Sequence, residues 1–493
     1  MKKLRLISFL MVLLLLTSIL ASCLKGDRPT ETEETSAGQT DAITTTSGEA
    51  VTQYLNDIPI NEYTIVYSTP DVDYSKRAAN YIQEQIMMRT GIELEVKKDS
   101  EGTFAHEIVV GETSREISSN LNPDMKDLQF AILANDDHIA MEGDYFVIAA
   151  AAYFFVETYI TEDTINAQIP HEVRVHDPIA KEAKNFILLI GDGMGINQTR
   201  LFEAFDVDTV NEPAHNDGED FFYGYMLPYQ GTSRTNSLSG TTDSAAGGTA
   251  LATGYKTFNS RVGRDMNYND VQSLTELAGS LGKSTAVLST DSVTGATPAA
   301  FSAHADDRND SEVIKESQEA LKEKYGTSIY CGFSGYDQTS IATLEYRIKK
   351  TLNKLSTNEN GFFLMYEEAH IDKHCHNSEM EKTFNAVVRF NQVIGVFMEF
   401  VFYNPETVLL ITADHETGGL QIDSDGEFSY TSQTNSSGSR NHTAAAVPVF
   451  AYGIGMEIFN NREIENVEIP KLYAKLWGVE SFGGPIHTYD YFF

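Results

Sequence analysis

The sequence predicts a doubly wound α/β domain, with a mostly parallel sheet and helices on both faces, preceded by a small α+β domain. Unbroken apolar runs recur from residue 185 onward, and stretches with helical periodicity lie between them. Strands that are covered on both faces are uniformly apolar, as in parallel sheets, and regular alternation with helices is typical of α/β folds. The runs are NFILLI (Asn185–Ile190), TAVLST (Thr285–Thr290), GFFLMY (Gly361–Tyr366), TVLLIT (Thr407–Thr412) and VPVFAY (Val447–Tyr452).

Length and charge narrow the classes of function. The chain has 493 residues, with 71 acidic and 36 basic side chains, for a formal charge of −35. This length allows two or three domains with sizeable cores. The acidic balance argues against nucleic acid as a partner, because affinity for phosphate backbones comes mainly from Lys and Arg. The same balance suits an exported protein, or one that binds divalent cations.

The N-terminus predicts export and a lipid anchor. Basic residues open an apolar run, Leu6–Leu20, that is short for a membrane span. The following Leu-Ala-Ser-Cys resembles the lipobox of bacterial lipoproteins, which implies that residues 1–22 are a signal peptide and that Cys23 is lipidated. We therefore expect a protein anchored to the outer face of a bacterial cell membrane. An ordinary secretory signal is the alternative.

Two further regions precede the α/β domain. Residues 23–55 are rich in Thr, Ser and Glu, which predicts a flexible tether. Residues 56–178 alternate short apolar strands with helical patterns such as Ser75–Thr90 and Tyr145–Tyr159, and they predict an α+β accessory domain. Its order resembles the non-catalytic domain ahead of some glycoside hydrolases. A spacing role is expected, and glycan contact by residues 63–178 is the alternative.

Acidic side chains follow three of the apolar runs in the α/β domain, residues 179–493. Asp192 follows the first run, Glu367 the third, and Asp414 with His415 the fourth. Ligands of open α/β sheets bind beyond the carboxyl ends of the strands. A single Asp there would be a helix cap, but three carboxylates at one sheet edge would repel one another without cations. The sequence therefore predicts a metal site.

Histidines strengthen this hypothesis. Asp372 and His376 are four residues apart, which allows them to share one face of a helix, and His442 precedes the last apolar run. Asp and His ligands with an open position suit catalytic zinc. Two neighbours in this segment are expected to stay outside the ligand set, as solvent or packing residues: His374 and Cys375.

The candidate nucleophile is Ser244 in Thr-Asp-Ser-Ala-Ala-Gly-Gly-Thr. A helix that starts here and ends before Gly254 places Ser244 at its N-terminus, where free N–H groups favour an anion. A serine at this position alone is usually a cap. Next to metal ions, its hydroxyl can become a nucleophile.

Six motifs in order, across about residues 184–455, resemble the alkaline phosphatase family: G-D-G-M-G, T-D-S-A-A, A-T-P-A, E-x4-D-x3-H, A-D-H and H-T. The resemblance implies two Zn²⁺ and one Mg²⁺. The implied ligands of the first zinc are Asp372, His376 and His442. Those of the second zinc are Asp192, Asp414 and His415, with Ser244 nearby. Those of magnesium are Asp192, Thr297 and Glu367.

The same resemblance implies the reaction. Small phosphate monoesters would be hydrolysed through a phosphoserine on Ser244, with release of inorganic phosphate, and Arg308 would clamp the phosphoryl oxygens. A guanidinium is the right shape for that contact. Two departures stand out. Gly295 occupies a position where relatives carry Asp or His, and only residues 416–441 separate His415 from His442, so the crown insertion of many relatives is absent.

Other functions fit these residues less well. A sulfatase would carry C/S-x-P-x-R at the nucleophile, which T-D-S-A-A-G is not. A phosphodiesterase side activity stays open, because it depends on the loops around the site. A surface-anchored binding protein with a degenerate core is disfavoured, since every implied ligand is present.

Overall fold

The computed structural model describes residues 53–69, 72–121, 125, 128–161, 165–205, 221–330 and 341–485. The expected signal peptide, Cys23 and most of the tether lie outside the described residues. Thr52–Phe493 forms one compact unit. The expected boundary between residues 178 and 179 stays a prediction. It falls between β9 (Arg174–His176) and β10 (Asn185–Gly191), which belong to two different sheets.

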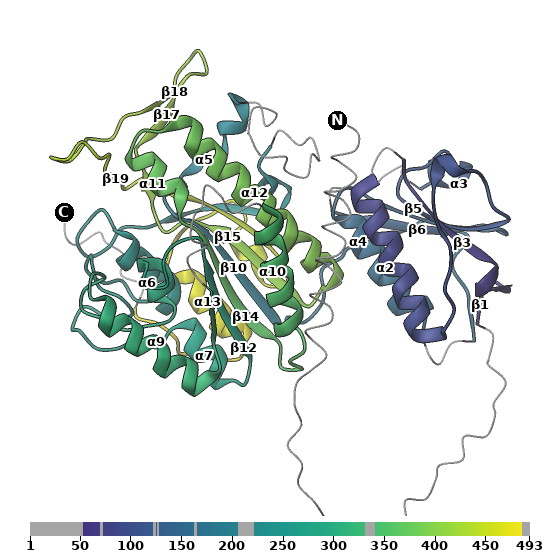
Figure 1. Cartoon of the computed structure of the whole chain (residues 1–493), viewed down its shortest axis with the longest axis horizontal. Helices are drawn as coiled ribbons and strands as arrows, with labels where there is room; N and C mark the ends of the chain where they lie inside the picture. Colours follow the sequence, from purple (N-terminus) through teal and green to yellow (C-terminus); the bar gives the residue numbers. More distant parts are fainter. Residues whose placement is uncertain are drawn as a thin grey trace, which may run out of the picture. The chain divides into compact units, whose positions relative to one another are not determined.

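The N-terminal sheet has six strands in the order β4-β3-β5-β7-β6-β9. Strands β4, β3, β5 and β7 are parallel, and β6 runs antiparallel to both β7 and β9. A three-stranded sheet, β2-β1-β8, accompanies it. Helices α2 and α4 pack together beside the sheet (Figure 1). The bounds are β1 Tyr54–Leu55, β2 Ile58–Pro59, β3 Tyr63–Tyr67, α2 Val72–Thr90, β4 Val96–Lys98, β5 His106–Val110, α3 Glu116–Ser119, β6 Phe130–Ala134, β7 His138–Gly143, α4 Val147–Tyr159 and β8 Asn166–Ala167.

The C-terminal sheet has eight strands in the order β13-β12-β14-β10-β15-β20-β11-β21. The five adjacent strands β13, β12, β14, β10 and β15 are parallel, whereas β20 runs antiparallel to both β15 and β11. This arrangement is the mostly parallel α/β fold that the sequence predicts. The bounds are β11 Tyr229–Arg234, β12 Ser284–Ser289, β13 Ser328–Tyr330, β14 Phe362–Glu368, β15 Thr407–Thr412, β20 Val447–Tyr452 and β21 Glu463–Glu465.

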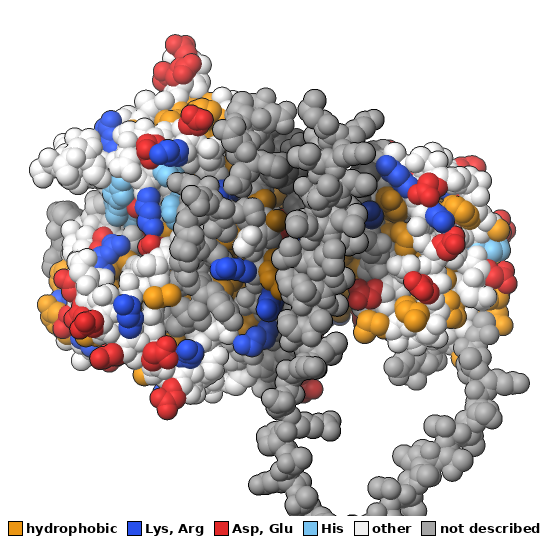
Figure 2. All heavy atoms as spheres, viewed as in Figure 1, with side chains coloured by type: hydrophobic (Ala, Val, Ile, Leu, Met, Phe, Trp, Pro, Cys, Tyr) orange, Lys and Arg blue, Asp and Glu red, His pale blue; other side chains and the backbone are white. Residues whose placement is uncertain are grey.

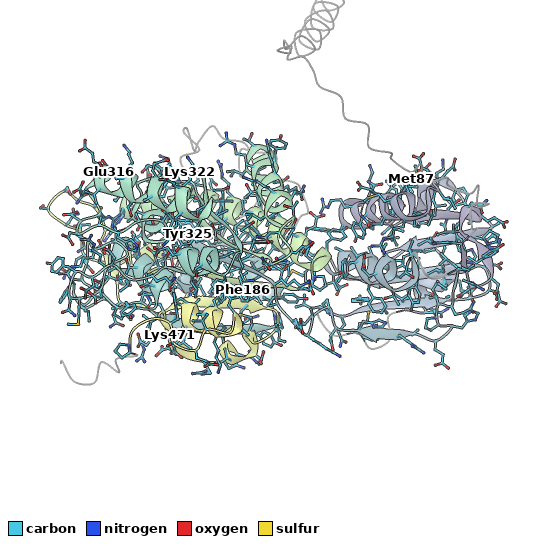
Figure 3. All side chains as sticks on the ribbon, turned by 90° about the horizontal axis from the view of Figure 1, so that it is seen from below. Met87, Phe186, Glu316, Lys322, Tyr325 and Lys471 are labelled. Atoms are coloured by element: carbon cyan, nitrogen blue, oxygen red, sulfur yellow. The ribbon has the colours of Figure 1, made fainter. Side chains whose placement is uncertain are left out.

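Helices cover both faces of this sheet, and β10 shows how. Phe186, Leu188 and Ile190 pack on one face with residues of α7 and α13, whereas Ile187 and Leu189 pack on the other with residues of α10 and α12. Successive strand side chains point to opposite faces, so a strand covered twice is apolar throughout. Figure 3 shows Phe186 in the interior, in contrast to Glu316 and Lys322 on the outer side of α9.

The remaining elements surround the sheet. Helix α12 is the one helix within the described ranges that is long and apolar enough to cross a membrane, and 78% of its most apolar window is buried in the fold, as in a core helix. The bounds are α5 Ile196–Thr199, α6 Ser244–Thr253, α7 Leu274–Ser280, α8 Ala296–Ala300, α9 Ser311–Tyr325, α10 Ile341–Leu355, α11 His370–His376, α12 Met380–Tyr403, α13 Glu468–Leu476, β16 Glu416–Thr417, β17 Leu420–Ile422, β18 Phe428–Tyr430 and β19 His442–Thr443. Short 3₁₀ turns span Ile60–Glu62, Asp99–Glu101, Leu201–Glu203, Tyr223–Met226 and Met456–Phe459.

Candidate active site

The parallel register brings the predicted carboxylates to one sheet edge. Ile190 of β10 pairs with Glu367 of β14 on one side and with Thr412 of β15 on the other. Asp192 and Asp414 each follow their strand by two residues or fewer. The carboxyl ends of the three central strands therefore open onto a common site, as the sequence predicts.

A first group of ligand atoms comes from Asp192, Asp414 and His415, all buried. His415 Nε2 lies 3.5 Å from Asp192 Oδ1 and 3.2 Å from Asp414 Oδ2. Within the described residues, neither of these two carboxylate oxygens accepts a hydrogen bond. Burial, reinforced by neighbouring carboxylates, raises the pKa of Asp192 well above its usual range and that of Asp414 to about 7. A divalent cation would satisfy these oxygens and keep both groups ionised.

A second group lies beside the first. His376 Nε2 is 3.3 Å from Asp372 Oδ1, and His442 Nε2 is 3.5 Å from the same oxygen. Helix α11 supplies Asp372 and His376, whose spacing of four residues puts them on one face. His415 also belongs here, because its ligand atom lies within 4.8 Å of those of Asp372 and His442. The two groups therefore share one imidazole.

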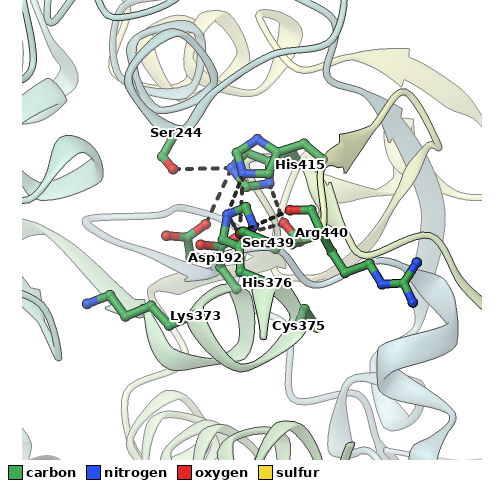
Figure 4. A network of polar contacts seen from close by, with 12 residues as sticks. Asp192, Ser244, Lys373, Cys375, His376, His415, Ser439 and Arg440 are labelled. Atoms are coloured by element: carbon green, nitrogen blue, oxygen red, sulfur yellow. Dashed lines mark hydrogen bonds and ion pairs between the residues drawn. The ribbon is translucent and has the colours of Figure 1, made fainter. Parts of the chain in front are cut away.

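The other ring nitrogens of these histidines are held by the protein. His376 Nδ1 contacts the carbonyl oxygen of Arg440, and His442 Nδ1 lies 2.9 Å from the carbonyl oxygen of Thr242. A protonated Nδ1 bonded to a carbonyl leaves Nε2 with a free lone pair, which is the form that binds a metal. Figure 4 shows His376, His415 and Asp192 converging at the centre of this network.

Electrostatics favour the ligand forms of His415 and Asp372. Burial, helped by His442, lowers the pKa of His415 well below its usual range. Burial alone would raise the pKa of Asp372, but the hydrogen bond from His442 and the neighbouring histidines outweigh it and lower that pKa. A neutral imidazole and an ionised carboxylate are the forms that coordinate zinc.

The candidate nucleophile lies against the shared imidazole. Ser244 is the first residue of α6, and its Oγ is 3.2 Å from His415 Nε2. Asp243 caps the helix by accepting from the backbone N–H of Ala246. Glycine at position 247 lets α6 approach the backbone of Asp414, because a Cβ there would lie 2.8 Å from the carbonyl oxygen of Asp414. The predicted helix end at Gly254 is also observed, with φ of 72°.

The predicted phosphate clamp is held beside the nucleophile. One guanidinium nitrogen of Arg308 lies 3.3 Å from Asp243 Oδ2, and the backbone N–H of Arg308 donates to Ser260 at 2.7 Å. Ser260 N–H donates to the same Asp243 oxygen at 2.9 Å. One carboxylate therefore both caps α6 and orients Arg308, whose side chain keeps 32% exposure for an external anion.

The predicted magnesium ligands also lie together. Glu367 is fully buried and accepts a hydrogen bond from Ser289, the residue opposite it on β12. Thr297, on α8, faces Glu367 from a buried position. Burial raises the pKa of Glu367 to about 8, and its charge is among those that raise the pKa of Asp192. A carboxylate pair and a hydroxyl are oxygen ligands of the kind Mg²⁺ prefers.

Two residues of the histidine segment stay outside the ligand groups, as the sequence indicates. His374 Nδ1 lies 3.0 Å from Glu379. The Cys375 thiol is buried near Tyr430, and burial raises its pKa to about 12, so it packs as a thiol. In Figure 2 histidine side chains (pale blue) reach the visible face in more than one place, and some of them lie close to Lys and Arg side chains.

The sequence interpretation missed three residues that shape the site. Thr417 donates to Asp372 Oδ1 at 2.5 Å and lies 3.2 Å from His415 Nδ1, so it orients a member of each group. Glu416 is buried and accepts four hydrogen bonds from the surrounding loops. Asp291 pairs with Lys373. Glu416 and Thr417 directly follow the A-D-H motif, and this position is a signal from which they could have been identified.

Comparison with known proteins agrees with this geometry. A family model described as alkaline phosphatase matches residues 183–331 and 335–438, just over half of the chain. Alkaline phosphatase 4 of Bacillus subtilis is 30% identical over 299 residues, which cover 50% of this chain and 64% of that protein. The chain thus matches less than two thirds of the length of this curated relative.

Solved structures show the same fold. The structure of alkaline phosphatase from the Antarctic bacterium TAB5 has a TM-score of 0.50 and 26% identity, covering 60% of this chain and 98% of that one. A TAB5 variant with magnesium bound in its M3 site has a TM-score of 0.50 and 25% identity, covering 61% and 99%.

Proposed function

The chain belongs to the alkaline phosphatase family, and we propose that it is a metal-dependent phosphomonoesterase. Two adjacent groups of acidic and imidazole ligands share His415, and the hydroxyl of Ser244 lies 3.2 Å from the shared ring nitrogen. This observation carries the proposal, because a hydroxyl beside paired cations is the arrangement that phosphoryl transfer requires.

The proposed ligand sets follow the two groups, with the shared His415 assigned to the second. Asp372, His376 and His442 would hold one zinc. Asp192, Asp414 and His415 would hold the second. A magnesium ion would use Asp192, Thr297 and Glu367. The orphaned buried oxygens of Asp192 and Asp414 and the facing nitrogens of His376 and His442 support these sets. When bound, the cations supply positive charge that offsets the negative charge of the phosphoryl group and lowers the pKa of a nearby hydroxyl or water.

In the proposed reaction, Ser244 Oγ gives its proton to solvent water and attacks phosphorus. The Oγ–P bond forms as the bond from phosphorus to the ester oxygen breaks, and the leaving alcohol takes a proton from water. A hydroxide derived from water then attacks phosphorus, the Oγ–P bond breaks, and inorganic phosphate leaves. Arg308 would hold two phosphoryl oxygens in each step, while the N-terminus of α6 presents free N–H groups to the anion.

The test is hydrolysis of p-nitrophenyl phosphate by the purified protein at alkaline pH. We expect turnover that a chelator abolishes and added Zn²⁺ and Mg²⁺ restore. Ser244→Ala should lower kcat by at least about a thousandfold, whereas Ser280→Ala, which removes an exposed hydroxyl on α7, should leave it unchanged. Turnover that is indifferent to chelator, or a fully active Ser244→Ala protein, would contradict the proposal.

We also propose that the protein is exported and anchored through a lipid on Cys23. The support is the sequence alone: a basic start, an apolar run and Leu-Ala-Ser-Cys. Bacteria that express the protein would be labelled with a radioactive fatty acid. We expect label and membrane association for the parent and their loss in Cys23→Ser. Unlabelled parent protein would refute the anchor. Glycan contact by residues 63–178 stays a prediction, which polysaccharide pull-down would test.

A further inference from the structure

A charged pair lies beside the proposed magnesium ligands, and the proposed reaction does not use it. Lys373 Nζ donates to Asp291 Oδ1 at 2.7 Å. Asp291 lies in the loop between β12 and α8, and Lys373 lies on α11. The side chain of Asp291 is 29% exposed and that of Lys373 is 42% exposed. In Figure 4, Lys373 and Arg440 extend to opposite sides of the network.

The pair is linked directly to the proposed ligands. The backbone N–H of Asp291 donates to Ser289 Oγ at 2.8 Å, and Ser289 in turn donates to Glu367. Lys373 interacts electrostatically with both Asp192 and Glu367. Its ammonium group therefore lies in the field of the same two carboxylates that would hold magnesium.

The close approach of Asp291 explains the glycine at position 295. A Cβ on Gly295 would lie 2.5 Å from Asp291 Oδ2 and 2.9 Å from its Cγ. The φ of Gly295 is −54°, which any residue can adopt, so backbone conformation does not require glycine here. The carboxylate of Asp291 occupies the space that the Cβ of a side chain at position 295 would need. A side chain at position 295 would therefore require the Asp291 carboxylate to move.

We propose that Asp291 is a positioning residue for the magnesium site. It takes the space and supplies the charge that a side chain at position 295 would otherwise bring, and through Lys373 it sets how tightly a divalent cation binds at Asp192, Thr297 and Glu367. This inference rests on the proposed function, because it concerns the third cation of that site.

Charge balance gives the direction of the effect. An ammonium group near Asp192 and Glu367 competes with a cation for the same carboxylates. Pairing with Asp291 offsets the ammonium charge and directs it away from them. Without the Asp291 charge, Lys373 would turn its full charge toward the site and repel Mg²⁺, since charges a few ångströms apart interact strongly in a partly buried setting.

The experiment measures cation binding instead of activity. The whole protein would be freed of metal with a chelator, loaded with two equivalents of Zn²⁺, and titrated with Mg²⁺ in a calorimeter. We expect Asp291→Asn to raise the dissociation constant for Mg²⁺ about tenfold, which corresponds to about 1.4 kcal/mol. The matched control is Asp270→Asn, which removes a carboxylate paired with Arg264 at 2.7 Å in the loop before α7, and it should bind Mg²⁺ as the parent does.

Two further variants separate positioning from a general loss of charge. Lys373→Met should bind Mg²⁺ more tightly than the parent, and Asp291→Asn added to it should weaken binding much less than Asp291→Asn alone. The transplanted pair, Asp291→Gly with Gly295→Asp, should recover most of the lost affinity, because it returns a carboxylate from the other position. Failure of the transplant to recover affinity would show that charge alone is insufficient and would contradict the proposed replacement.

The outcome that overturns the inference is a parent-like Mg²⁺ isotherm for Asp291→Asn in a protein that melts as a folded one. Equal weakening in Asp270→Asn would overturn it as well. These results are distinguishable from failure of the proposed function. If the parent binds neither Zn²⁺ nor Mg²⁺ and hydrolyses no phosphate ester, the function fails. If the parent does all of these and Asp291→Asn binds normally, only this inference fails.

Discussion

His376 Nε2 and His442 Nε2 face each other at 3.1 Å. Their Nδ1 atoms are both engaged with backbone carbonyl oxygens, which points both Nε2 atoms, and the lone pairs they carry when the rings are neutral, toward each other. Two lone pairs at this distance repel, and a cation between them removes the repulsion. The contact therefore favours a metal ion bound by both rings.

We predict that His442→Ala loses one of the two bound zinc ions. The variant removes a ligand and leaves His376 and Asp372 with an incomplete set, and loss of a ligand weakens a zinc site strongly. Metal content after dialysis, measured by mass spectrometry, should fall from about two zinc ions to about one per chain. His374→Ala, which removes the neighbour paired with Glu379, should keep the parent content. Full zinc retention by His442→Ala would contradict the assignment.

Arg308→Ala is expected to weaken substrate and phosphate binding more than turnover. The guanidinium offers parallel donors to two phosphoryl oxygens, an interaction present both before and during the reaction. The Michaelis constant and the inhibition constant of inorganic phosphate should each rise about 10- to 100-fold. Arg264→Ala provides the control, because Arg264 pairs with Asp270 and Asp306 nearby. A Michaelis constant that stays at the parent value would mean that Arg308 does not reach the phosphoryl group.

Much of this site could be predicted because it depends on local patterns. The run TVLLIT coincides with β15, and the spacing of Asp372 and His376 places both on α11. The end of a buried parallel strand can be located in the sequence, because the apolar run stops there. The residue after it can therefore be assigned to the edge of the sheet where ligands bind. Short-range periodicity therefore predicted both the elements and the candidate ligands.

Long-range contacts could not be predicted in the same way. Asp291 and Lys373 are 82 residues apart, and no periodicity relates a loop residue to a helix residue across that distance. In the sequence nothing distinguishes Glu416 from the other acidic residues. In the structure it is buried and accepts hydrogen bonds from several loops. Sharing of His415 between two ligand groups depends on where α11, β19 and the ends of β10 and β15 meet, which is set by tertiary packing.

The metal-free protein should become less stable as pH rises from about 4 to about 8. Burial raises the pKa of Glu367 to about 8 and that of Asp414 to about 7 in the folded state. In this window the folded chain binds more protons than the unfolded chain, so the free energy of unfolding falls as pH rises. The loss should reach several kcal/mol, because one unit of pKa shift corresponds to about 1.4 kcal/mol.

Cations should reverse this dependence, because they favour the ionised carboxylates. We expect the gain in melting temperature on adding Zn²⁺ and Mg²⁺ to be small near pH 5 and largest near pH 8. Melting curves of metal-free and metal-loaded protein across this range test the prediction. A gain that is equal at both ends would show that these carboxylates do not change protonation on metal binding.

The last prediction concerns Glu416, whose buried carboxylate joins two short strands to the rest of the site. Oε1 accepts from Gln198 Nε2 at 3.0 Å and from the N–H of Leu420 at 3.1 Å, while Oε2 accepts from the N–H of Gly419 and from Thr443 Oγ1. Glu416 also pairs with Thr443 across the β16–β19 ladder, beside His442.

Glu416→Ala leaves these buried donors without an acceptor, which should lower the free energy of unfolding by about 2–4 kcal/mol. Because β19 carries His442, the variant should also bind the zinc of that group less tightly. Urea unfolding and zinc titration measure the two effects. Glu427→Gln, at an exposed position before β18, should change neither. Loss of stability with unchanged zinc affinity would show that β19 keeps His442 in place without this anchor.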